Sequence, residues 1–470
     1  MNRIFFRITF FCFLSIFASG QQSKEAGYVK MNADLAFLKA VLYEAHPAAF
    51  QYISRDSLDG LFAEMAFDSS EKVSILELEK RVRVLLNRVG CVHTSITGSV
   101  FEADEGMTMP FDVFAKGNRI WIKEDLADSS SSLIGSRLLA INGHDAQTMI
   151  NEMKNYHSSD GYRSTLMDAL INSNNWFSHL YQYYFDADSV RTYQLLTNDA
   201  DTLVIRRANI KVVAKTTTND SQWIKYDSNV SLRLDTAHAI AILKIRSFSK
   251  GPILGTKINK HHYKKAMAYA QKNGCENLVI DLRGNLGGDA TSGNALASFF
   301  IKEPHQFTSK RHEAKIWKYA VLKSKFGVII NFLFGDLFAS RRPTFKNGIS
   351  ISRIRSNPGQ FSFKKLFVLT DGFTASTASN TASLFKYNTD AIMVGSETAG
   401  GESALNAFFF PVIKLPNSKI KIQIPQYHIN LNIVQNKGRG VIPDVPVDYT
   451  IQDVLSGSDL EMNAVIKVIE

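Results

Sequence analysis

The chain has 470 residues, too many for a single hydrophobic core, and this length predicts two or three domains. Apolar residues make up 45% of the chain, the formal net charge is +10, and no long low-complexity tract occurs, which excludes a disordered chain. The few cysteines include no C-x-x-C pair, so the sequence predicts no metal site. We expect Cys91 and Cys275 to be buried free thiols rather than a disulfide.

The first twenty residues have the layout of a signal peptide. Arg3 and Arg7 precede an apolar run that ends in small residues before Gly20. The sequence therefore predicts cleavage near Gly20 and an exported protein, periplasmic or secreted. An uncleaved anchor is the alternative, although the apolar run is short for a membrane span.

Residues 21–100 are predicted to form a small helical region. Apolar residues recur at helical spacing in two runs, 35–42 and 75–86. A short β-rich segment follows at 89–98 and carries His93. A lone histidine in a strand is more often a satisfied structural residue than a catalytic base.

Residues 101–215 read as a β-rich module. A hairpin is predicted at 109–122, a strand, turn and helix at 133–153, and two more strands at 192–197 and 202–207. This order is similar to that of a PDZ module. A helical insert rich in aromatic residues, 162–185, is expected to pack against it.

Residues 216–470 are predicted to form an α/β core. Four apolar segments, 239–245, 277–282, 366–371 and 391–396, have the character of buried parallel strands, and helical patterns lie between them. The connection at 303–363 is too long for a plain crossover and must contain structure of its own. Between Lys310 and Arg355 it holds 11 Lys and Arg against 2 acidic residues. It is either a lid over the cleft or a peripheral membrane contact.

Two segments of this core carry the chemical signal. The first is LVIDLRGNLGGD (278–289), and the second is LFVLTDGFTASTASNTASLF (366–385). Each has an apolar strand, a turn of small residues and the start of a helix, so each leaves backbone amides without partners. Side by side, one turn could hold a nucleophilic hydroxyl and the other an oxyanion. Taken singly, each is also compatible with an ordinary turn or a helix cap.

In this order the two segments resemble the C-terminal processing (tail-specific) and tricorn-like serine peptidases. The resemblance implies that Ser376 is the nucleophile. It also implies that the amides of Gly287, Gly288 and Thr377 form the oxyanion hole. A further stretch, 438–466, is similar to the closing strand and final helix of that family. The implied fold is an α/β protease core of ClpP/crotonase-like β-α repeats, preceded by the small helical domain and the PDZ-like module.

The general base of this chain cannot be the lysine that the best-known branch of the family uses. That branch places a lysine after a G-x-x-T-x-G turn, and here the turn at 395–400 is followed by Gly401. The tricorn-like branch takes a histidine from a G-x-x-H-T segment, which residues 90–94 match, so the resemblance implies His93 as base. Glu402 is a candidate to orient its ring, and a solvated loop carboxylate is the alternative.

The sequence thus predicts an exported serine peptidase with a peptide or protein substrate, no metal or organic cofactor, and no nucleic-acid partner. The alternative is an inactive relative that binds a peptide or an apolar ligand in the same cleft. Membrane contact could come from the basic insert at 303–363. The sequence does not predict the oligomeric state.

Overall fold

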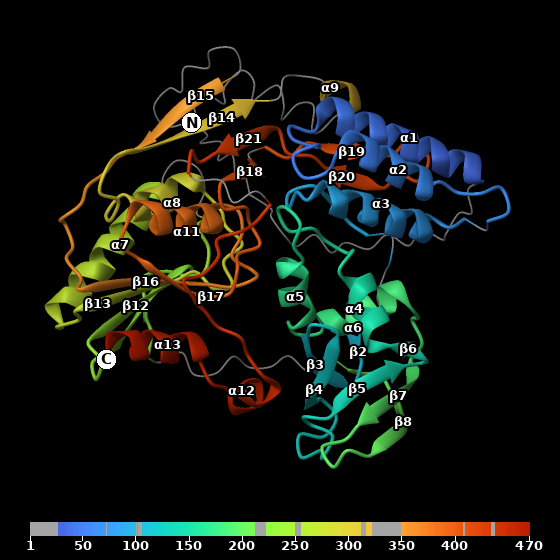
Figure 1. Cartoon of the computed structure of the whole chain (residues 1–470), viewed down its shortest axis with the longest axis horizontal. Coiled ribbons are helices and arrows are strands. Elements are labelled where there is room, and N and C mark those ends of the chain that lie inside the picture. Colours follow the sequence, from blue (N-terminus) through green and yellow to red (C-terminus); the bar gives the residue numbers. More distant parts are fainter. Residues whose placement is uncertain are drawn as a thin grey trace, which may run out of the picture.

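The computed structural model of the protein describes residues 27–71, 73–99, 101, 106–211, 222–249, 255–311, 316–321, 349–407, 409–433 and 438–470. The predicted signal peptide, 1–20, lies outside these residues, as does much of the predicted insert, including 322–348. The described chain has a mixed α/β fold. Figure 1 shows three groups of elements: N-terminal helices, a β-rich module and a larger α/β core.

The N-terminal helices pack on a small sheet to which the C-terminal half of the chain contributes. Ser54 and Ser74 cap two of the helices, because their hydroxyls accept hydrogen bonds from the first-turn amides. Leu38 and Ile422 share one fully buried core, so residues far apart in sequence complete it. The elements are α1 (Tyr28–Ala45), α2 (Arg55–Glu64) and α3 (Ile75–Val89), with β1 (Ser95–Ile96), β20 (Lys421–Gln423) and β19 (Val412–Lys414) in that sheet order.

The module confirms the predicted hairpin, the strand–turn–helix unit, the later strand pair and the helical insert. Its antiparallel sheet has the order β3-β4-β5-β7-β8, with β6 paired to β5. The strands are β3 (Phe111–Lys116), β4 (Arg119–Asp125), β5 (Arg137–Ile141), β6 (His144–Asp145), β7 (Val190–Leu196) and β8 (Thr202–Ala208). The helices are α4 (Ala146–Met153), α5 (Thr165–Ile171) and α6 (Trp176–Tyr184), and a small ribbon joins β2 (Met107–Thr108) to β9 (Ile210–Lys211).

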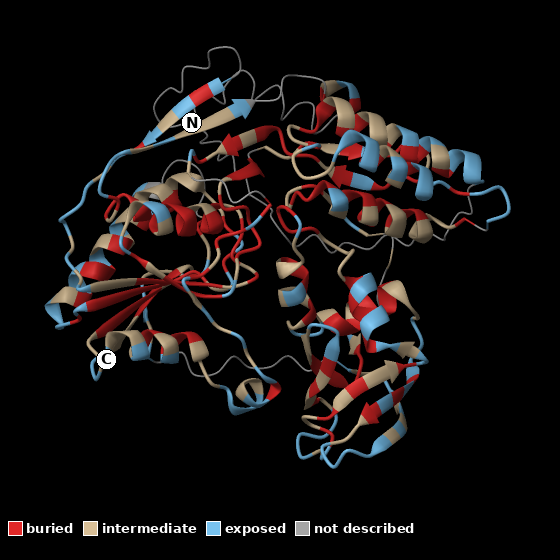
Figure 2. Cartoon of the chain, viewed as in Figure 1, coloured by how far each residue is buried: buried red, intermediate tan, exposed pale blue. Residues whose placement is uncertain are grey.

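The core is built on a seven-stranded sheet whose central strands are parallel and buried on both faces (Figure 2). Continuous apolar runs such as NLVID suit that position, because helices cover both sides. The strand order is β10 (Ile224–Lys225), β11 (Val230–Asp235), β12 (Ile240–Ile245), β13 (Asn277–Asp281), β16 (Lys365–Thr370), β17 (Ile392–Gly395) and β22 (Val445–Pro446). The helices are α7 (Gly255–Lys272), α8 (Ala290–Ala297), α11 (Thr377–Asn388), α12 (Ile451–Ser456) and α13 (Leu460–Ile469).

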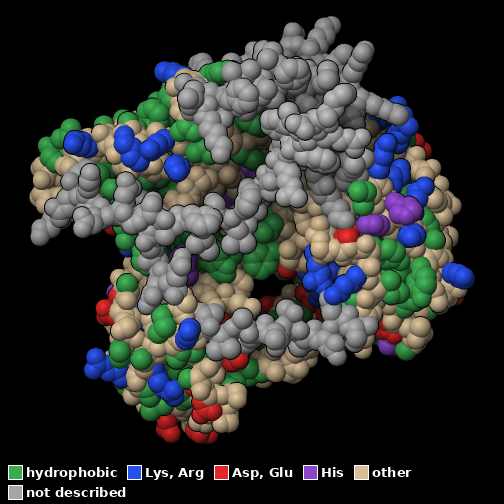
Figure 3. Space-filling model, turned by 180° about the vertical axis from the view of Figure 1, so that it is seen from behind, with side chains coloured by type: hydrophobic (Ala, Val, Ile, Leu, Met, Phe, Trp, Pro, Cys, Tyr) green, Lys and Arg blue, Asp and Glu red, His purple; other side chains and the backbone are tan. Residues whose placement is uncertain are grey.

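The long connection at 303–363 contains structure of its own, as predicted. Two of its strands join two later strands in an antiparallel sheet of order β15-β14-β21-β18. These are β14 (His305–Arg311), β15 (Ile349–Ile354), β21 (Tyr427–Asn430) and β18 (Ala404–Ala407), and the short helix α9 (Ile316–Tyr319) packs on the N-terminal core. The space-filling view from behind shows a hollow between the module and the core (Figure 3).

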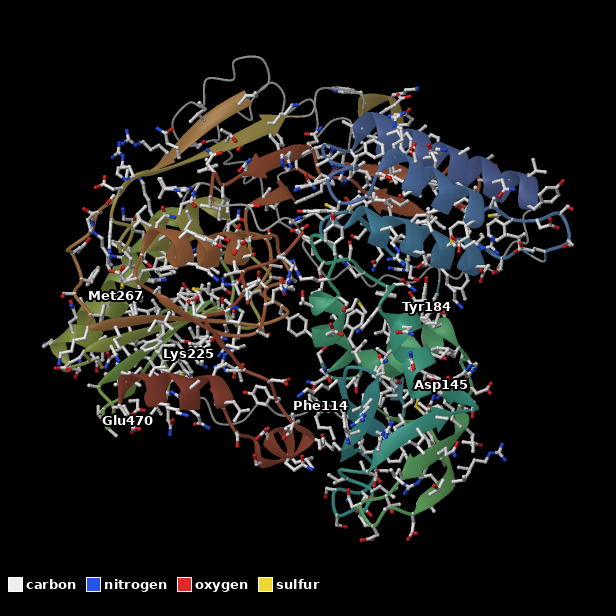
Figure 4. The ribbon with its side chains drawn as sticks, viewed as in Figure 1. Phe114, Asp145, Tyr184, Lys225, Met267 and Glu470 are labelled. Carbon is white, nitrogen blue, oxygen red and sulfur yellow. The ribbon has the colours of Figure 1, made fainter. Side chains whose placement is uncertain are left out.

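Buried and half-buried polar contacts join the N-terminal helices to the module. Arg83 of α3 pairs with Glu79 at 2.8 Å and donates to the Tyr156 carbonyl of the module at 2.9 Å. Lys80 donates to the carbonyl of Tyr184, which is labelled on α6 in Figure 4. These contacts fix the helical group to the module. They therefore also help to place the segment that follows α3.

That segment, 89–98, differs from the β-rich stretch that we predicted. Val89 still belongs to α3, and Gly90 ends the helix in the left-handed region with φ +65°. The Thr94 amide then donates to the Cys91 carbonyl at 3.0 Å, which closes a tight turn around His93. Only Ser95 and Ile96 are in a strand. His93 therefore lies on a turn between the helix cap at Gly90 and the short strand that starts at Ser95.

The two cysteines are free and buried, as expected. Cys91 belongs to the N-terminal core and Cys275 to the core of the large sheet, so the two thiols are kept apart. Among the described residues, no helix is both long enough and apolar enough to cross a bilayer.

Candidate active site

Ser376 lies in a tight turn between strand β16 and helix α11. Asp371 holds the turn, because its Oδ1 accepts hydrogen bonds from the Phe373 amide at 3.0 Å and from the Thr374 hydroxyl at 3.1 Å. Ser376 has φ +52° and ψ −126°, a conformation that non-glycine residues seldom adopt. Strain of this kind persists only where the surroundings enforce it, and it clusters at functional sites. The residue is partly exposed.

Ser379, three residues further on, has a different environment. It is fully buried, and its hydroxyl lies 2.8 Å from the Gly400 carbonyl oxygen and 3.0 Å from Thr398 Oγ1. Its hydroxyl is therefore already hydrogen-bonded to the 398–401 turn, and it holds that turn against α11. Of the serines in this run, Ser376 is the one placed to meet a substrate.

The glycine-rich turn after β13 lies directly against Ser376. Buried Asn285 shapes it, because its Nδ2 donates to the Ile245 carbonyl at 2.9 Å and its Oδ1 accepts from the Gly287 amide at 2.8 Å. Gly287 and Gly288 have φ +109° and +134°, which side chains rarely allow. A Cβ on Gly287 would stand 2.8 Å from the Ser376 Cβ. The two predicted turns are thus adjacent.

The amides around this contact are not equivalent. The Gly287 N–H already donates to Asn285, whereas no described residue accepts from the Gly288 N–H. Thr377 is the first residue of α11, so its N–H has no acceptor within the helix. The Thr377 hydroxyl donates to the Gly288 carbonyl at 2.7 Å and joins the two turns. Gly288 and Thr377 are therefore the amides left to bind an anion.

Arg283 supports the base of the glycine-rich turn from behind. Its guanidinium contacts Asp281 at 3.0 Å, Asp459 at 2.8 Å and Glu461 at 3.0 Å. A cation so fully paired serves structure rather than substrate binding. The closing helix α13, which starts after Asp459, is thereby tied to the strand that leads into the active-site turn.

His93 stacks on Phe410, with ring centroids 5.2 Å apart and an interplanar angle of 12°. Its Nδ1 is buried and has no hydrogen-bond partner among the described residues. Burial lowers the pKa of His93 to about 4; the nearby His157 adds to this effect, and the main-chain carbonyl of Asn406 opposes it. The imidazole is therefore neutral at pH 7 and able to accept a proton.

The His93 segment and the serine turn meet through a small apolar cluster. Leu166 of α5, Ala375 and Ala399 form it, and Val92 packs against them. The neighbours of His93 and Ser376 in the chain are thus in one cluster. Helix α5 of the module takes part in it, which we did not predict for the aromatic insert.

Asp160 is a buried carboxylate that the sequence did not single out. Its Oδ1 accepts from the Val92 amide at 2.9 Å, and its Oδ2 accepts from the Gly401 amide at 3.1 Å. Burial raises the pKa of Asp160 to about 6, although the two amide hydrogen bonds and the charge of Arg163 oppose this. A single aspartate in a loop of serines gave no signal of this role.

Glu402, the candidate orienting acid, is almost fully buried rather than solvated. Its Oε1 accepts a hydrogen bond of 2.5 Å from the Tyr387 hydroxyl of α11. Burial raises its pKa, and the hydrogen bond from Tyr387 opposes this only in part. The contact that the structure gives this carboxylate is thus with a phenol on the serine helix. In the described part of the chain, no group of three His, Cys, Asp or Glu side chains could hold a metal ion.

A cavity of about 500 Å³ lies beside these segments. It borders on both of them: Ser403 and Ala404 follow the Gly401 turn, and His46 contacts Thr94, next to His93, at 2.9 Å. The Ala48 amide donates to His46 Nδ1, so Nε2 carries the proton given to Thr94. The lining residues are Tyr43, His46, Pro47, Ala48, Ala49, Phe50, Gln51, Tyr52, Ser403, Ala404, His428, Asn430 and Gly438.

Comparison with known proteins agrees with this geometry. Residues 239–447, which hold both turns, match the model of Peptidase family S41. The part of the chain that carries both turns is therefore similar to the S41, or tail-specific, family of serine-type peptidases.

Two solved structures of mature CPAF have the same fold. One, in complex with lactacystin, has a TM-score of 0.62 and 15% identity, over 94% of this chain and 98% of that chain. The other has a TM-score of 0.59 and 14% identity, over 94% of this chain and 97% of that chain. At such identities the likeness concerns the fold alone. A search of the curated proteins finds no match.

Proposed function

We propose that the protein is an exported peptidase in which Ser376 attacks the scissile carbonyl carbon and His93 Nε2 takes the serine proton. The observation that carries this is the contact between the strained Ser376 turn and the glycine-rich turn. A serine hydroxyl is a weak nucleophile and needs such a base. A neutral imidazole at pH 7 meets that need.

The oxyanion formed by the attack would be bound by the amides of Gly288 and Thr377. Both are preorganised, since the Thr377 hydroxyl fixes the two turns to each other. The imidazolium of His93 then returns its proton to the leaving amine. Water, deprotonated by the same imidazole, hydrolyses the acyl-enzyme and regenerates Ser376.

Several narrower parts of the sequence interpretation belong to the same proposal. Residues 101–215 would serve as a PDZ-like module, and the core would follow the ClpP/crotonase-like plan. The peptide or protein substrate would be met outside the cytoplasm after removal of residues 1–20. Glu402 would support the serine helix through Tyr387, because its hydrogen bond is made there.

A fluorophosphonate probe tests the proposal. Wild type should be labelled and should hydrolyse peptides, and Ser376→Ala should abolish both while unfolding at nearly the same temperature. Ser379→Ala is the matched control and should keep the label. If wild type binds peptides but takes no label, the chain is an inactive binding protein; if the label moves to Ser379, Ser376 is not the nucleophile.

A further inference from the structure

The loop between α4 and α5 lies between the two halves of the proposed catalytic pair. On one side, the Gly161 amide donates to the Gly90 carbonyl at 2.9 Å, and the Ser158 hydroxyl donates to the Cys91 carbonyl at 2.8 Å. On the other side, the Asp160 amide donates to the Ala399 carbonyl at 2.9 Å. This loop therefore contacts both the histidine segment and the turn beside the serine.

The Asp160 side chain completes this connection with one oxygen on each segment. Val92, bound by Oδ1, precedes His93 in the chain, and Gly401, bound by Oδ2, follows Gly400. A Cβ on Gly400 would lie 2.9 Å from the Ser376 nitrogen, so Gly400 lies against the nucleophile's own backbone. One buried carboxylate thus joins the segment of the proposed base to the turn that lies against the proposed nucleophile.

We propose that Asp160 is a positioning residue that holds the His93 segment in register with Ser376. The proposal rests on the proposed function of that pair. A carboxylate is suited to this task because both of its oxygens are acceptors, whereas an amide has only one. Misplacement of a catalytic group by about 1 Å can cost a hundredfold in rate, so a shared anchor matters.

The charges around Asp160 indicate how the anchor responds to pH. Arg163 donates to the Asp160 main-chain carbonyl at 2.7 Å, but it also pairs with Glu397 at 2.8 Å. Tyr52 and the Cys91 thiol face the carboxylate as well, and burial with Asp160 raises the pKa of both. Because the pKa of Asp160 is raised to about 6, the carboxylate gains a proton in mild acid.

Protonation would weaken one of the two amide contacts, since the protonated oxygen becomes a donor facing a donor. Activity should therefore fall as pH decreases through about 6. His93 titrates lower, near 4, because it is buried. The decrease in kcat/KM near pH 6 would report protonation of Asp160, and the decrease near pH 4 would report protonation of His93.

The decisive variant is Asp160→Asn, measured by peptide hydrolysis between pH 3.5 and 8. We expect kcat to fall by about tenfold to a hundredfold with KM changed less than about threefold. The limb near pH 6 should disappear and the limb near pH 4 should remain. The matched control is Ser158→Ala, which removes a buried hydrogen bond between the same loop and the His93 segment but none to the Gly401 turn. It should lower the unfolding temperature while leaving both limbs in place.

Three outcomes would overturn the proposal. The first is an Asp160→Asn enzyme with wild-type kcat and a wild-type acid limb. The second needs no variant: a wild-type profile with a limb near 4 and none near 6. The third is hydrogen exchange at the Val92 and Gly401 amides that is as slow in Asp160→Asn as in wild type, and this readout requires no catalysis. Absence of probe labelling in wild type would instead contradict the assignment of Ser376, so the two failures are distinguishable.

Discussion

Two serines at the start of α11 differ in backbone strain and in burial, and this divides their roles. Ser376 is strained and partly exposed, whereas Ser379 is unexposed and hydrogen-bonded to the 398–401 turn. A nucleophile needs an accessible lone pair, and Ser379 has committed its hydroxyl to a structural contact. The surroundings of the two serines, rather than their positions in the T-A-S-T-A-S run, therefore favour Ser376 as the proposed nucleophile.

Replacing Ser379 by Ala should affect stability rather than chemistry. The change removes one of the two hydroxyls that contact the buried Gly400 carbonyl, and Thr398 Oγ1 remains at 2.9 Å, so the free energy of unfolding should fall by about 1 kcal/mol. Chemical denaturation measures this loss. Per folded molecule, kcat should stay within about threefold of wild type, because the altered group does not touch substrate. A drop in kcat as large as that of Ser376→Ala would contradict this division of roles.

Burial changes the pKa of His93 from the value expected for a solvated histidine. An unperturbed imidazole would titrate near ~6.5, whereas the enclosed ring of His93 has its pKa lowered to about 4. Because a general base works in its neutral form, His93 stays competent to a lower pH than a solvated histidine would. His93→Ala should lose at least ~100-fold in kcat/KM at pH 7, measured with a peptide substrate. Full activity of that variant would place the base elsewhere.

The glycine-rich turn acts as a unit with α11, and this determines which of its glycines can be replaced. In Gly287→Ala the new Cβ would lie 2.8 Å from the Ser376 Cβ, so the two turns would have to separate. We expect kcat to fall by about a hundredfold, comparable to the loss of an oxyanion donor. The readouts are kcat and KM for one peptide.

Gly284→Ala is the control for that substitution. Gly284 also has a positive φ, +75°, but nothing lies within 4 Å of its would-be Cβ. Backbone strain should cost about 1–2 kcal/mol of stability and leave kcat nearly unchanged. Equal losses of kcat in the two variants would mean that strain, and not contact with Ser376, governs the turn.

The features that could be predicted from the sequence are those that a short segment encodes by itself. The strands β13 and β16 were predicted because a buried parallel strand is a continuous apolar run. Both active-site turns were predicted because each is encoded within a short segment. Asp160 was not, since its partner Gly401 is 241 residues away and no spacing rule connects them. The His93 segment was predicted as β-rich from its own residues. The structure closes it into a turn directly after the helix cap at Gly90, and the predicted pattern does not show that cap.

Across the whole molecule, the proposed site draws residues from all three groups of elements. The core supplies both turns, the segment after α3 supplies His93, and the module supplies the Asp160 loop and α5. Contacts such as Arg83 with Tyr156 maintain this arrangement at a distance from the chemistry. The relative placement of the three groups therefore determines the geometry of the proposed site.

The cavity beside the site should set substrate preference. None of its described lining residues is Asp, Glu, Lys or Arg, so a charged substrate side chain would lose part of its hydration there without gaining a carboxylate, Lys or Arg partner. In a peptide series varied at single positions, one position should favour Phe or Leu over Asp or Lys by at least about tenfold in kcat/KM. Ser403→Trp, which fills the cavity from its rim, should raise KM about tenfold for such peptides and leave the labelling rate of a small fluorophosphonate within about twofold. Ser403→Ala is the control and should change neither, and an unchanged preference in the Trp variant would place the substrate outside this cavity.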